Sequence, residues 1–438
     1  MKRVVLISRI MIVLFFIITG CSTGNKIITI DDSSGFLGET SSPVSVELNL
    51  GWSELEAAGE NRLAVREMTV NNNGNALAPV QLAGDDSDES RQKLVFIMPQ
   101  GEKGIRKFRL VESDTPFDPV ISDKDSKGQY LVAEKGKKVL QYNYQTIYRD
   151  DVVRDEKEKR EEYARNARDT FTVTSIYAVP RSNYIHPLYG LEGEMLTRDW
   201  PSKGHPHHRA IFWAWPEVYY GSELGDIYAL QRVFARPTGN IETTGGSVYA
   251  QIKAENLWMW EDNETIVNEQ AIIRVYRAAP DNRIIDLTLY FKALKDSITI
   301  ATRYTDSYGG LNLRMQTPED QDIFYHTDSI GDYPQRAWSD FSGIFEGNRN
   351  ASGLMVLQHN SNPEYPGTWV EYPQLAWVQP TFPTPGTRYA LKKDEPLVLR
   401  YRLIVHNGDR LENVFSEKAW DAYHSDLSPV CNNSELEK

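Results

Sequence analysis

Short runs of apolar residues, alternating with polar residues or continuous, recur through this chain between clusters of Asn, Gly and Asp. Runs of this length that favour β-branched and aromatic residues predict β-strands. Such patterns dominate after Thr170, whereas amphipathic helical spacing is scarce outside residues 412–425. Many strands with little helix favour a mostly β protein built as an antiparallel β-sandwich. The expected strands cover residues 45–50, 93–98, 108–112, 171–179, 247–260, 271–278, 283–294, 298–304, 353–359 and 397–406.

The same pattern divides the chain into segments. We expect a small N-terminal β domain over residues 43–112 and the main β-sandwich, which carries the catalytic site, over residues 113–430. Residues 21–42, rich in Ser, Gly and Asp, predict a tether, and residues 431–438 predict a polar tail. Residues 149–169 are dense in charge and lack Gly and Pro, which is typical of a helix or a solvated excursion.

Residues 1–20 have the features of a targeting segment. Basic residues among the first nine precede or flank an apolar run over residues 10–18, which is short for a membrane span. The following Ile-Thr-Gly-Cys resembles a bacterial lipobox, which implies a lipid anchor on Cys21. Ser22 in place of Asp resembles lipoproteins released to the outer membrane, on its periplasmic or cell-surface side. The alternative is an ordinary signal peptide with an incidental cysteine.

Composition excludes several classes of protein. The formal net charge of −13 argues against nucleic acid as a partner, although a local cluster of Arg and Lys could still bind an anionic substrate. If Cys21 carries lipid, Cys431 has no partner for an intramolecular disulfide, and a Cys-rich metal site is excluded. The chain has no G-x-S-x-G, H-E-x-x-H, Walker or Rossmann motif in context, which argues against serine hydrolysis, zincin proteolysis and nicotinamide chemistry.

Residues 184–217 carry the strongest chemical signal, because they hold four of the eight histidines. Histidine titrates near neutrality, so it suits proton transfer and metal ligation. On an extended chain His205 and His207 point to one side and His208 to the other. His205 and His207 could therefore hold a divalent metal together, or one could serve as a base. The cofactor is left unknown, with none required as the default. The predicted catalytic residues are Tyr184, His186, His205, His207, His208 and Arg209.

A second group of residues is expected to bind substrate. Tryptophan faces stack against sugar rings, and charged or polar side chains at strand ends suit binding loops. Arg314 lies in the middle of a strand, where it could clamp a substrate carboxylate or take part in a buried ion pair. The predicted substrate-binding residues are Lys203, Trp213, Trp215, Glu217, Arg314, His326, Asp340, His359 and Trp369.

Six blocks of sequence carry a resemblance to a known family. They are YIHPLYG, LTRDWP, HPHHRAIFWAW, RAWSDFSG, LQHNSNPEYPGTW and RYRLIVHNGD. In this order, over roughly residues 130–410, the chain resembles the DUF6807 family, often labelled PmoA-like. Methane oxygenase is an integral membrane enzyme, and no membrane span follows residue 20, so that label is misleading. The resemblance implies an exported protein of sugar catabolism with a galactose-mutarotase-like β-sandwich. Ala210 stands where the family commonly has glycine.

The leading functional hypothesis is a lyase or dehydratase that abstracts a proton from uronic-acid-containing oligosaccharides. In it, His207 or His205 is the base, Tyr184 or His186 the acid, and Arg209 and Arg314 neutralise the carboxylate. The alternatives are a sugar mutarotase or epimerase, with a base such as Glu217, and a glycoside hydrolase with two carboxylates. A non-catalytic carbohydrate-binding lipoprotein is the rival from another class. The oligomeric state is not predicted.

Overall fold

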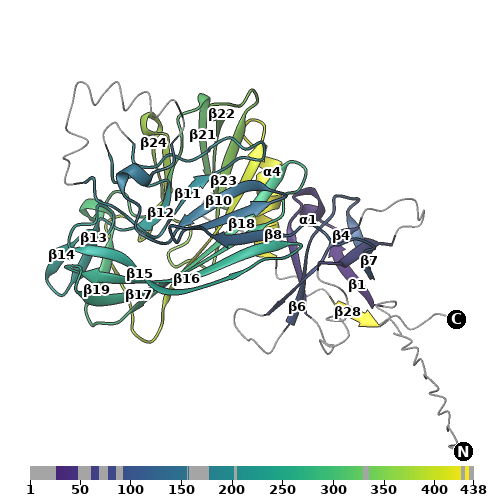
Figure 1. Ribbon diagram of the computed structural model, residues 1–438, viewed down its shortest axis with the longest axis horizontal. Helices are drawn as coiled ribbons and strands as arrows, with labels where there is room; N and C mark the ends of the chain where they lie inside the picture. The colour runs from purple at the N-terminus through teal and green to yellow at the C-terminus, as the bar shows by residue number, and fades with distance from the viewer. Residues whose placement is uncertain are drawn as a thin grey trace, which may run out of the picture.

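A computed structural model describes residues 26–47, 61–68, 77–84, 92–154, 156, 177–201, 205–328, 335–425 and 430–433. The fold is mostly β with antiparallel sheets, as the sequence predicts. Two eight-stranded sheets form the main sandwich, and a smaller β unit lies at one end of it (Figure 1).

The first large sheet, which we call the site sheet, has the strand order β24-β25-β20-β12-β11-β10-β9-β8. Its strands come from both ends of the main domain, so the sheet brings distant segments of the chain together. They are β8 (Val120–Lys124), β9 (Tyr130–Glu134), β10 (Lys137–Asn143), β11 (Tyr184–Leu188), β12 (Ile211–Ala214), β20 (Gly310–Arg314), β24 (Trp369–Tyr372) and β25 (Trp377–Pro380).

The second large sheet, which we call the back sheet, has the order β15-β16-β17-β18-β27-β23-β22-β21. Along β16 buried residues alternate with half-buried ones, as expected for a strand that packs one face on a core. The strands are β15 (Val233–Thr244), β16 (Tyr249–Trp260), β17 (Glu264–Tyr276), β18 (Asn282–Ala293), β21 (Glu319–Thr327), β22 (Ala337–Ile344), β23 (Ser352–Gln358) and β27 (Leu397–Asn407).

Apolar side chains from both sheets fill the space between them and form the largest core cluster. A four-stranded sheet, ordered β14-β13-β19-β26, adds to the domain. Its strands are β13 (Glu217–Tyr220), β14 (Glu223–Gly225), β19 (Ile298–Ala301) and β26 (Tyr389–Ala390). Within the described ranges, 3-10 helices lie in connections: η2 (Arg149–Asp151), η3 (Arg303–Thr305) and η4 (Pro373–Leu375).

The N-terminal unit consists of two small sheets packed around their own core. One has the order β28-β1-β7-β3-β4 and the other β2-β6-β5. The elements are β1 (Lys26–Asp32), α1 (Phe36–Glu39), β2 (Pro43–Glu47), β3 (Leu63–Glu67), β4 (Ala78–Pro79), β5 (Gln81–Gly84), β6 (Gln92–Ile97), β7 (Gly104–Glu112) and β28 (Val430–Asn433).

Two of the predicted boundaries are wrong. Residues 26–42 do not form a tether, because β1 pairs with both β7 and β28 and buries Ile28 and Ile30. Residues 431–433 do not belong to a free tail, because they pair with β1. The apolar alternation of Ile28 and Ile30 is a strand signal that the Ser- and Gly-rich composition around it obscured. Cys21 and most of residues 149–169 lie outside the described residues.

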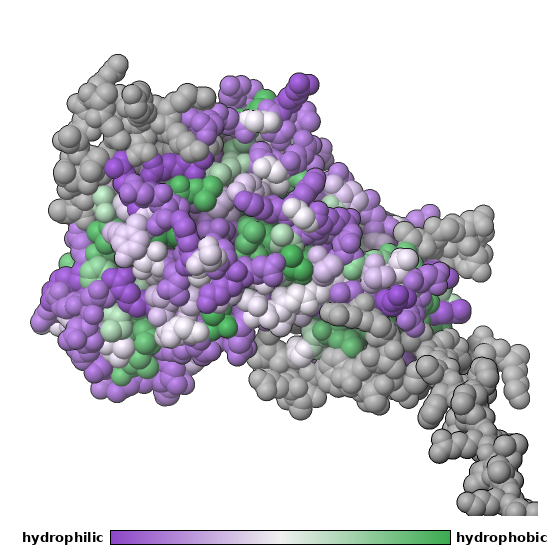
Figure 2. Space-filling view, in the orientation of Figure 1, coloured by the Kyte–Doolittle hydropathy of each residue, from purple (hydrophilic) through white to green (hydrophobic). Residues whose placement is uncertain are grey.

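The predicted C-terminal helix is confirmed as α4 (Asn413–His424). Trp420 and Ala419 of α4 join a cluster with residues of the back sheet, and Ala422 joins the core of the N-terminal unit. The helix therefore packs on both units. No helix among the described residues is long and apolar enough to cross a membrane. The face seen in Figure 2 is mainly hydrophilic, with scattered apolar residues.

Candidate active site

Residues 205–208, His-Pro-His-His, form a tight turn that we call the histidine turn. The His208 amide donates a hydrogen bond of 3.0 Å to the His205 carbonyl. The ring centroids of His207 and His208 are 4.8 Å apart, those of His205 and His208 4.9 Å, and those of His205 and His207 5.6 Å. The expectation that His208 points away is wrong, because the chain turns instead of running extended, and so all three imidazoles meet.

His205 and His208, the first and last residues of the histidine turn, continue a stack of aromatic rings. Tyr372 and Trp377, paired across the β24–β25 hairpin, stack at 5.0 Å, and Trp377 lies 6.1 Å from His208 with an interplanar angle of 23°. The His208 and His205 planes are only 16° apart. We call these four near-parallel rings the ring column. Each ring covers the face of its neighbour and Trp377 is buried, so only the ends of the column, at His205 and Tyr372, could meet the apolar face of a sugar.

Tyr228 closes the other side of the histidine turn. Its ring centroid is 5.6 Å from that of His207, 5.9 Å from His208 and 5.2 Å from Tyr308. The buried Arg181 fixes its loop by donating hydrogen bonds to the carbonyls of Ile227 (3.1 Å) and Tyr228 (2.9 Å). The Tyr228 hydroxyl is buried and has no hydrogen-bond partner within the described part of the chain. A buried phenol of this kind is free to bond a ligand.

The site sheet supplies a polar surface beside these rings. Alternate residues of β20 belong to the apolar core, so Asn312 and Arg314 face the opposite side. Arg314 pairs in register with Trp377, which puts Trp377 and Gln379 on that same side. The Gln379 amide and the Asn312 Oδ1 are buried and lack a hydrogen-bond partner among the residues described. Buried polar groups are normally paired, so this surface suits a polar ligand.

The three imidazoles are neutral at pH 7. Burial, with smaller effects of His205 and Arg181, lowers the pKa of His207 to about 3. Burial, His207 and Arg314 hold the pKa of His208 well below its ordinary value, and burial with Arg314 lowers that of His205. A neutral imidazole can accept a proton or bind a metal.

Cationic groups around the turn make the site electropositive in an acidic protein. Arg181 and Arg314 are buried, and both lower the pKa of His207. Arg303 Nη1 lies 3.7 Å from the carboxylate of Asp226, the nearby acid, and burial raises the pKa of Asp226 to about 6. Such a local field favours an anionic ligand in spite of the net charge of the chain.

The histidine turn is also the place where a metal could bind. One ligand atom from each of the three imidazoles lies within 4.8 Å of the others. Around a tetrahedral ion with bonds of 2.0–2.1 Å, ligand nitrogens are roughly 3.4 Å apart. The most widely separated ligand atoms would therefore have to approach each other by up to about 1.4 Å.

Residues 131–421, which include the whole site, match the family described as "Family of unknown function (DUF6807)". The match covers well over half of the chain. The protein belongs to the DUF6807 family. A search of curated proteins finds no match. The family assignment therefore carries no activity, and the function has to be argued from the geometry.

Two predicted catalytic residues of this DUF6807 protein, Tyr184 and Arg209, form a buried network with Asp199. Arg209 donates to both oxygens of Asp199 and, at 2.7 Å, to the Tyr184 hydroxyl, which itself donates to Asp199 Oδ2 at 2.7 Å. The Arg209 and Asp199 side chains are 1% and 0% exposed. These three groups satisfy one another, so they hold the strands that flank the histidine turn and present no free edge to a substrate.

His186 is likewise occupied. Its Nδ1 lies 3.0 Å from the Thr197 hydroxyl and its Nε2 2.7 Å from the Val153 carbonyl. Both ring nitrogens have partners, and burial lowers the pKa of His186. The predicted role as a proton donor does not fit this position.

Trp213 and Trp215 are core residues, so the expectation that they stack sugars is wrong. Both belong to the cluster between the two sheets. Trp213 donates its indole N–H to the buried Glu269, and Trp215 donates to the Phe382 carbonyl at 2.7 Å. Trp377, on the other face of the site sheet, is also buried, and it stacks between His208 and Tyr372.

The remaining predicted binding residues of this DUF6807 protein have partners elsewhere in the fold. His326 lies 2.9 Å from Asp328, Asp340 binds His406 at 3.0 Å, and the indole N–H of Trp369 donates to Thr327. His359 Nδ1 accepts from Ser361, and Glu217 lies 4.0 Å from Arg388. None of these contacts involves the histidine turn. Lys203 lies outside the described residues.

Sequence reasoning found the histidine turn and Arg314 but missed the groups around them. Tyr228, Tyr308 and Trp377 carry no motif in the printed sequence. The one usable signal was the alternation within two short strands. Gln379 lies two residues after Trp377, and Arg314 lies two residues after Asn312, so each pair shares a face of its strand.

Proposed function

We propose that this protein is a carbon–oxygen lyase that abstracts a proton from uronic-acid-containing oligosaccharides during polysaccharide degradation. It would act as an oligosaccharide dehydratase or as a polysaccharide lyase. One observation carries the proposal: His207 contacts the ring of Tyr228, whose buried hydroxyl has no partner among the described residues, and the charge of Arg314 acts on both groups. Elimination from a uronate requires three groups: a base, an acid and a group that neutralises the carboxylate.

One residue can be assigned to each of these roles. Arg314 neutralises the uronate carboxylate, which allows negative charge to develop there when the C5 proton leaves. His207 accepts that proton, and the C–H electron pair forms the double bond between C4 and C5. The bond from C4 to its oxygen breaks, and Tyr228 protonates the departing oxygen. The proton on His207 then restores Tyr228, so the products are a 4,5-unsaturated uronate and either water or the next sugar.

Two properties of the residues support these roles. Burial lowers the pKa of His207 to about 3, so the imidazole is neutral at neutral pH and can accept a proton. A bound carboxylate beside it would raise that pKa towards the range that suits a base. Burial raises the pKa of Tyr228 well above its ordinary value, so the phenol keeps the proton that it must donate. Tyr228 thus replaces Tyr184 and His186 as the acid, and Arg314 replaces Arg209 as the carboxylate clamp.

We favour direct acid–base chemistry over a metal at the histidine turn. Arg314 contributes to the lowered pKa of all three imidazoles, which means that its positive charge is felt at each of them. The same field weakens the binding of a divalent cation and attracts a substrate carboxylate. The ring spacing, wider than a tetrahedral ion needs, supports the same choice.

A non-catalytic carbohydrate-binding protein is the second candidate, and the ring column is the observation that favours it. Stacked rings bind sugar without chemistry. They do not account for a neutral imidazole beside a buried phenol that has no partner among the described residues, so the lyase remains the first choice.

We further propose that the sandwich is of the galactose-mutarotase-like type and that lipid on Cys21 anchors the protein to the outer membrane.

The test is an elimination assay with matched histidine variants. The purified protein is incubated with a panel of uronate oligosaccharides, while the absorbance of the 4,5-unsaturated product and the product masses are followed. His207→Gln should lower the rate by at least about 10²-fold, the scale of a positioned acid–base group, while substrate binding persists. His326→Gln, in a histidine bonded to Asp328 away from the turn, is the control and should keep the rate. Binding without unsaturated product from any uronate would leave the binding protein as the better description.

A further inference from the structure

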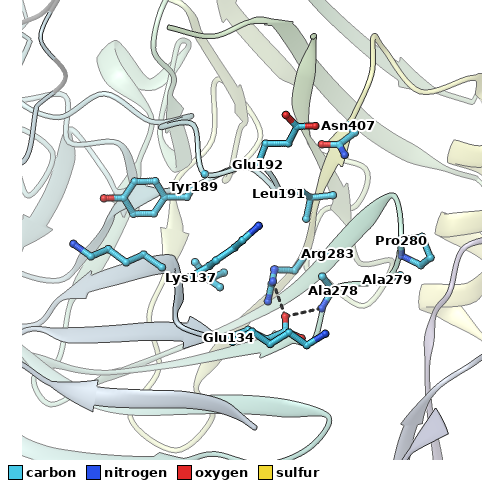
Figure 3. A pocket seen from close by; sticks show the side chains of 15 residues that line it. Glu134, Lys137, Tyr189, Leu191, Glu192, Ala278, Ala279, Pro280, Arg283 and Asn407 are labelled. Carbon is cyan, nitrogen blue, oxygen red and sulfur yellow. Dashed lines mark hydrogen bonds and ion pairs between the residues drawn. The ribbon is translucent and has the colours of Figure 1, made fainter. Parts of the chain in front are cut away.

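A cavity opens beside the β9–β10 hairpin, apart from the histidine turn (Figure 3). Its volume is about 470 Å³, within the range of pockets that hold small ligands. Its walls come from the hairpin, from residues 189–193 after β11, from the turn 278–280 between β17 and β18, and from the end of β27. It shares no residue with the histidine turn or the ring column.

The carboxylate at the floor of this cavity, that of Glu134, is already paired with cationic and amide groups. Glu134 accepts a hydrogen bond from Arg283 at 2.7 Å and from the Ala278 amide at 3.0 Å, as the dashed lines of Figure 3 show. Arg277 lies 3.9 Å from the same carboxylate. The single charge of Glu134 therefore faces two guanidinium groups, and no negative charge is left over for other cations.

Three lysines at the rim add to this positive charge. Lys135, Lys137 and Lys138 line the cavity and are exposed, and none of them forms an ion pair with another described residue. Glu192 is the one carboxylate of the lining besides Glu134. In a chain with a formal net charge of −13, this cluster reverses the sign of the charge locally.

The hairpin holds these lysines on a short, defined turn. Lys135 and Gly136 have φ values of 49° and 75°, as in the two-residue turns that match strand twist, and Lys137 pairs in register with Glu134. Tyr189, partly buried, and Leu191 supply an aromatic and apolar wall. Figure 3 shows Tyr189 and Lys137 on the same side of the cavity. A ring face beside cations is what an acidic sugar needs, since it pairs an apolar face with a charged edge.

We propose that this cavity is a second binding site, for one or two units of an anionic oligosaccharide that carries carboxylate or sulfate groups. The sugar class rests on the proposed function, whereas the cationic character of the site does not. The site would hold a polyanionic chain on a protein whose overall charge repels it.

The test compares the full chain with Lys137→Gln/Lys138→Gln in titration calorimetry at low salt. The probes are a polyuronate tetrasaccharide, a sulfated galactan tetrasaccharide and a neutral tetrasaccharide. Lys103→Gln/Lys107→Gln, which removes the same charge from exposed positions of the N-terminal unit, is the matched control. His207→Gln runs in parallel, so that loss of the proposed reaction is separated from loss of this site.

The cavity variant should weaken the affinity for an anionic probe about five- to tenfold and flatten its salt dependence, with the neutral probe unaffected. The two anionic probes show whether carboxylate or sulfate is preferred. Equal losses in the control variant would mean non-specific attraction, and unchanged affinity in the cavity variant would overturn the proposal. So would a wild-type protein that binds no anionic probe. Lysine-dependent binding without unsaturated product would keep this site and remove the proposed reaction.

Discussion

Replacement of Arg209 by Ala should destabilise the protein severely, because it would leave a buried carboxylate without its cation. Asp199 is 0% exposed, and both of its oxygens are bonded by Arg209 and Tyr184. Breaking a buried ion pair by removing one partner costs about 3–5 kcal/mol. If Asp199 instead became protonated in the variant, the cost would be similar. A carboxyl with an ordinary pKa of about 3.9 costs roughly 4 kcal/mol to protonate at pH 7.

Neighbouring rings make the loss larger than that of the charge alone. The Arg209 guanidinium lies 4.7 Å from the centroid of the Tyr184 ring and 4.4 Å from that of Trp200. Alanine would remove these contacts and leave a cavity. Against a typical total of about 5–15 kcal/mol, the variant would lose a large share of its stability.

The assay is chemical unfolding followed by far-UV circular dichroism, with two comparison variants. Arg232→Ala breaks ion pairs in which the arginine is 38% exposed, so it should destabilise the protein far less. The double variant Asp199→Asn/Arg209→Met removes both charges and should recover at least about 2 kcal/mol relative to the sum of the single losses.

One outcome would refute this reasoning. If Arg209→Ala stays within about 1 kcal/mol of wild type and instead loses activity, Arg209 faces the substrate. The original expectation of a carboxylate clamp would then stand in place of the buried network.

Three further predictions concern the site and the core. Tyr228→Phe should lower the elimination rate by at least about 10²-fold while its melting temperature stays equal or rises, since the buried hydroxyl has no partner among the described residues; a retained rate would remove Tyr228 as the acid. Chelation should leave the rate unchanged, and elemental analysis should find no stoichiometric metal; stoichiometric metal that His207→Ala loses would instead make the turn a metal centre. Burial alone would lower the pKa of His406, but Asp340 raises it above its ordinary value, so the pair stabilises the fold below about pH 6.5 and loses this as pH rises through the folded-state pKa. Unfolding free energies between pH 5.5 and 9 should show that decline in wild type and not in Asp340→Asn, and equal slopes would contradict it.

Local pattern was enough for the fold class and for one part of the site. Alternation of apolar and polar residues predicted the long strands β16, β17, β18 and β27 of the back sheet, because the two faces of a strand differ in burial wherever a sheet packs on a core. Many of the shorter strands were not predicted, and the strand expected over residues 171–179 falls largely outside the described residues. The same alternation was present in Ile28 and Ile30, and only the surrounding Ser and Gly led to the prediction of a tether. The density of histidine in residues 184–217 marked the turn, because clustered titratable groups are unusual in sequence as well as in space.

What the local pattern could not supply is which face each residue occupies and what lies opposite. Trp213 and Trp377 look alike in sequence, yet one fills the core and the other stacks on His208, since a shift of one residue along a strand exchanges its faces. Arg209 and Arg314 differ in the same way, because Arg209 is paired with the buried Asp199, whereas the charge of Arg314 acts on the three imidazoles of the histidine turn. Tyr228 reaches the histidine turn through a loop that Arg181 holds, and that hydrogen bond joins residues 47 positions apart in the chain. The sequence by itself determined the fold class and the histidines, and the tertiary structure decided which groups surround them, because long-range pairing has no local signature.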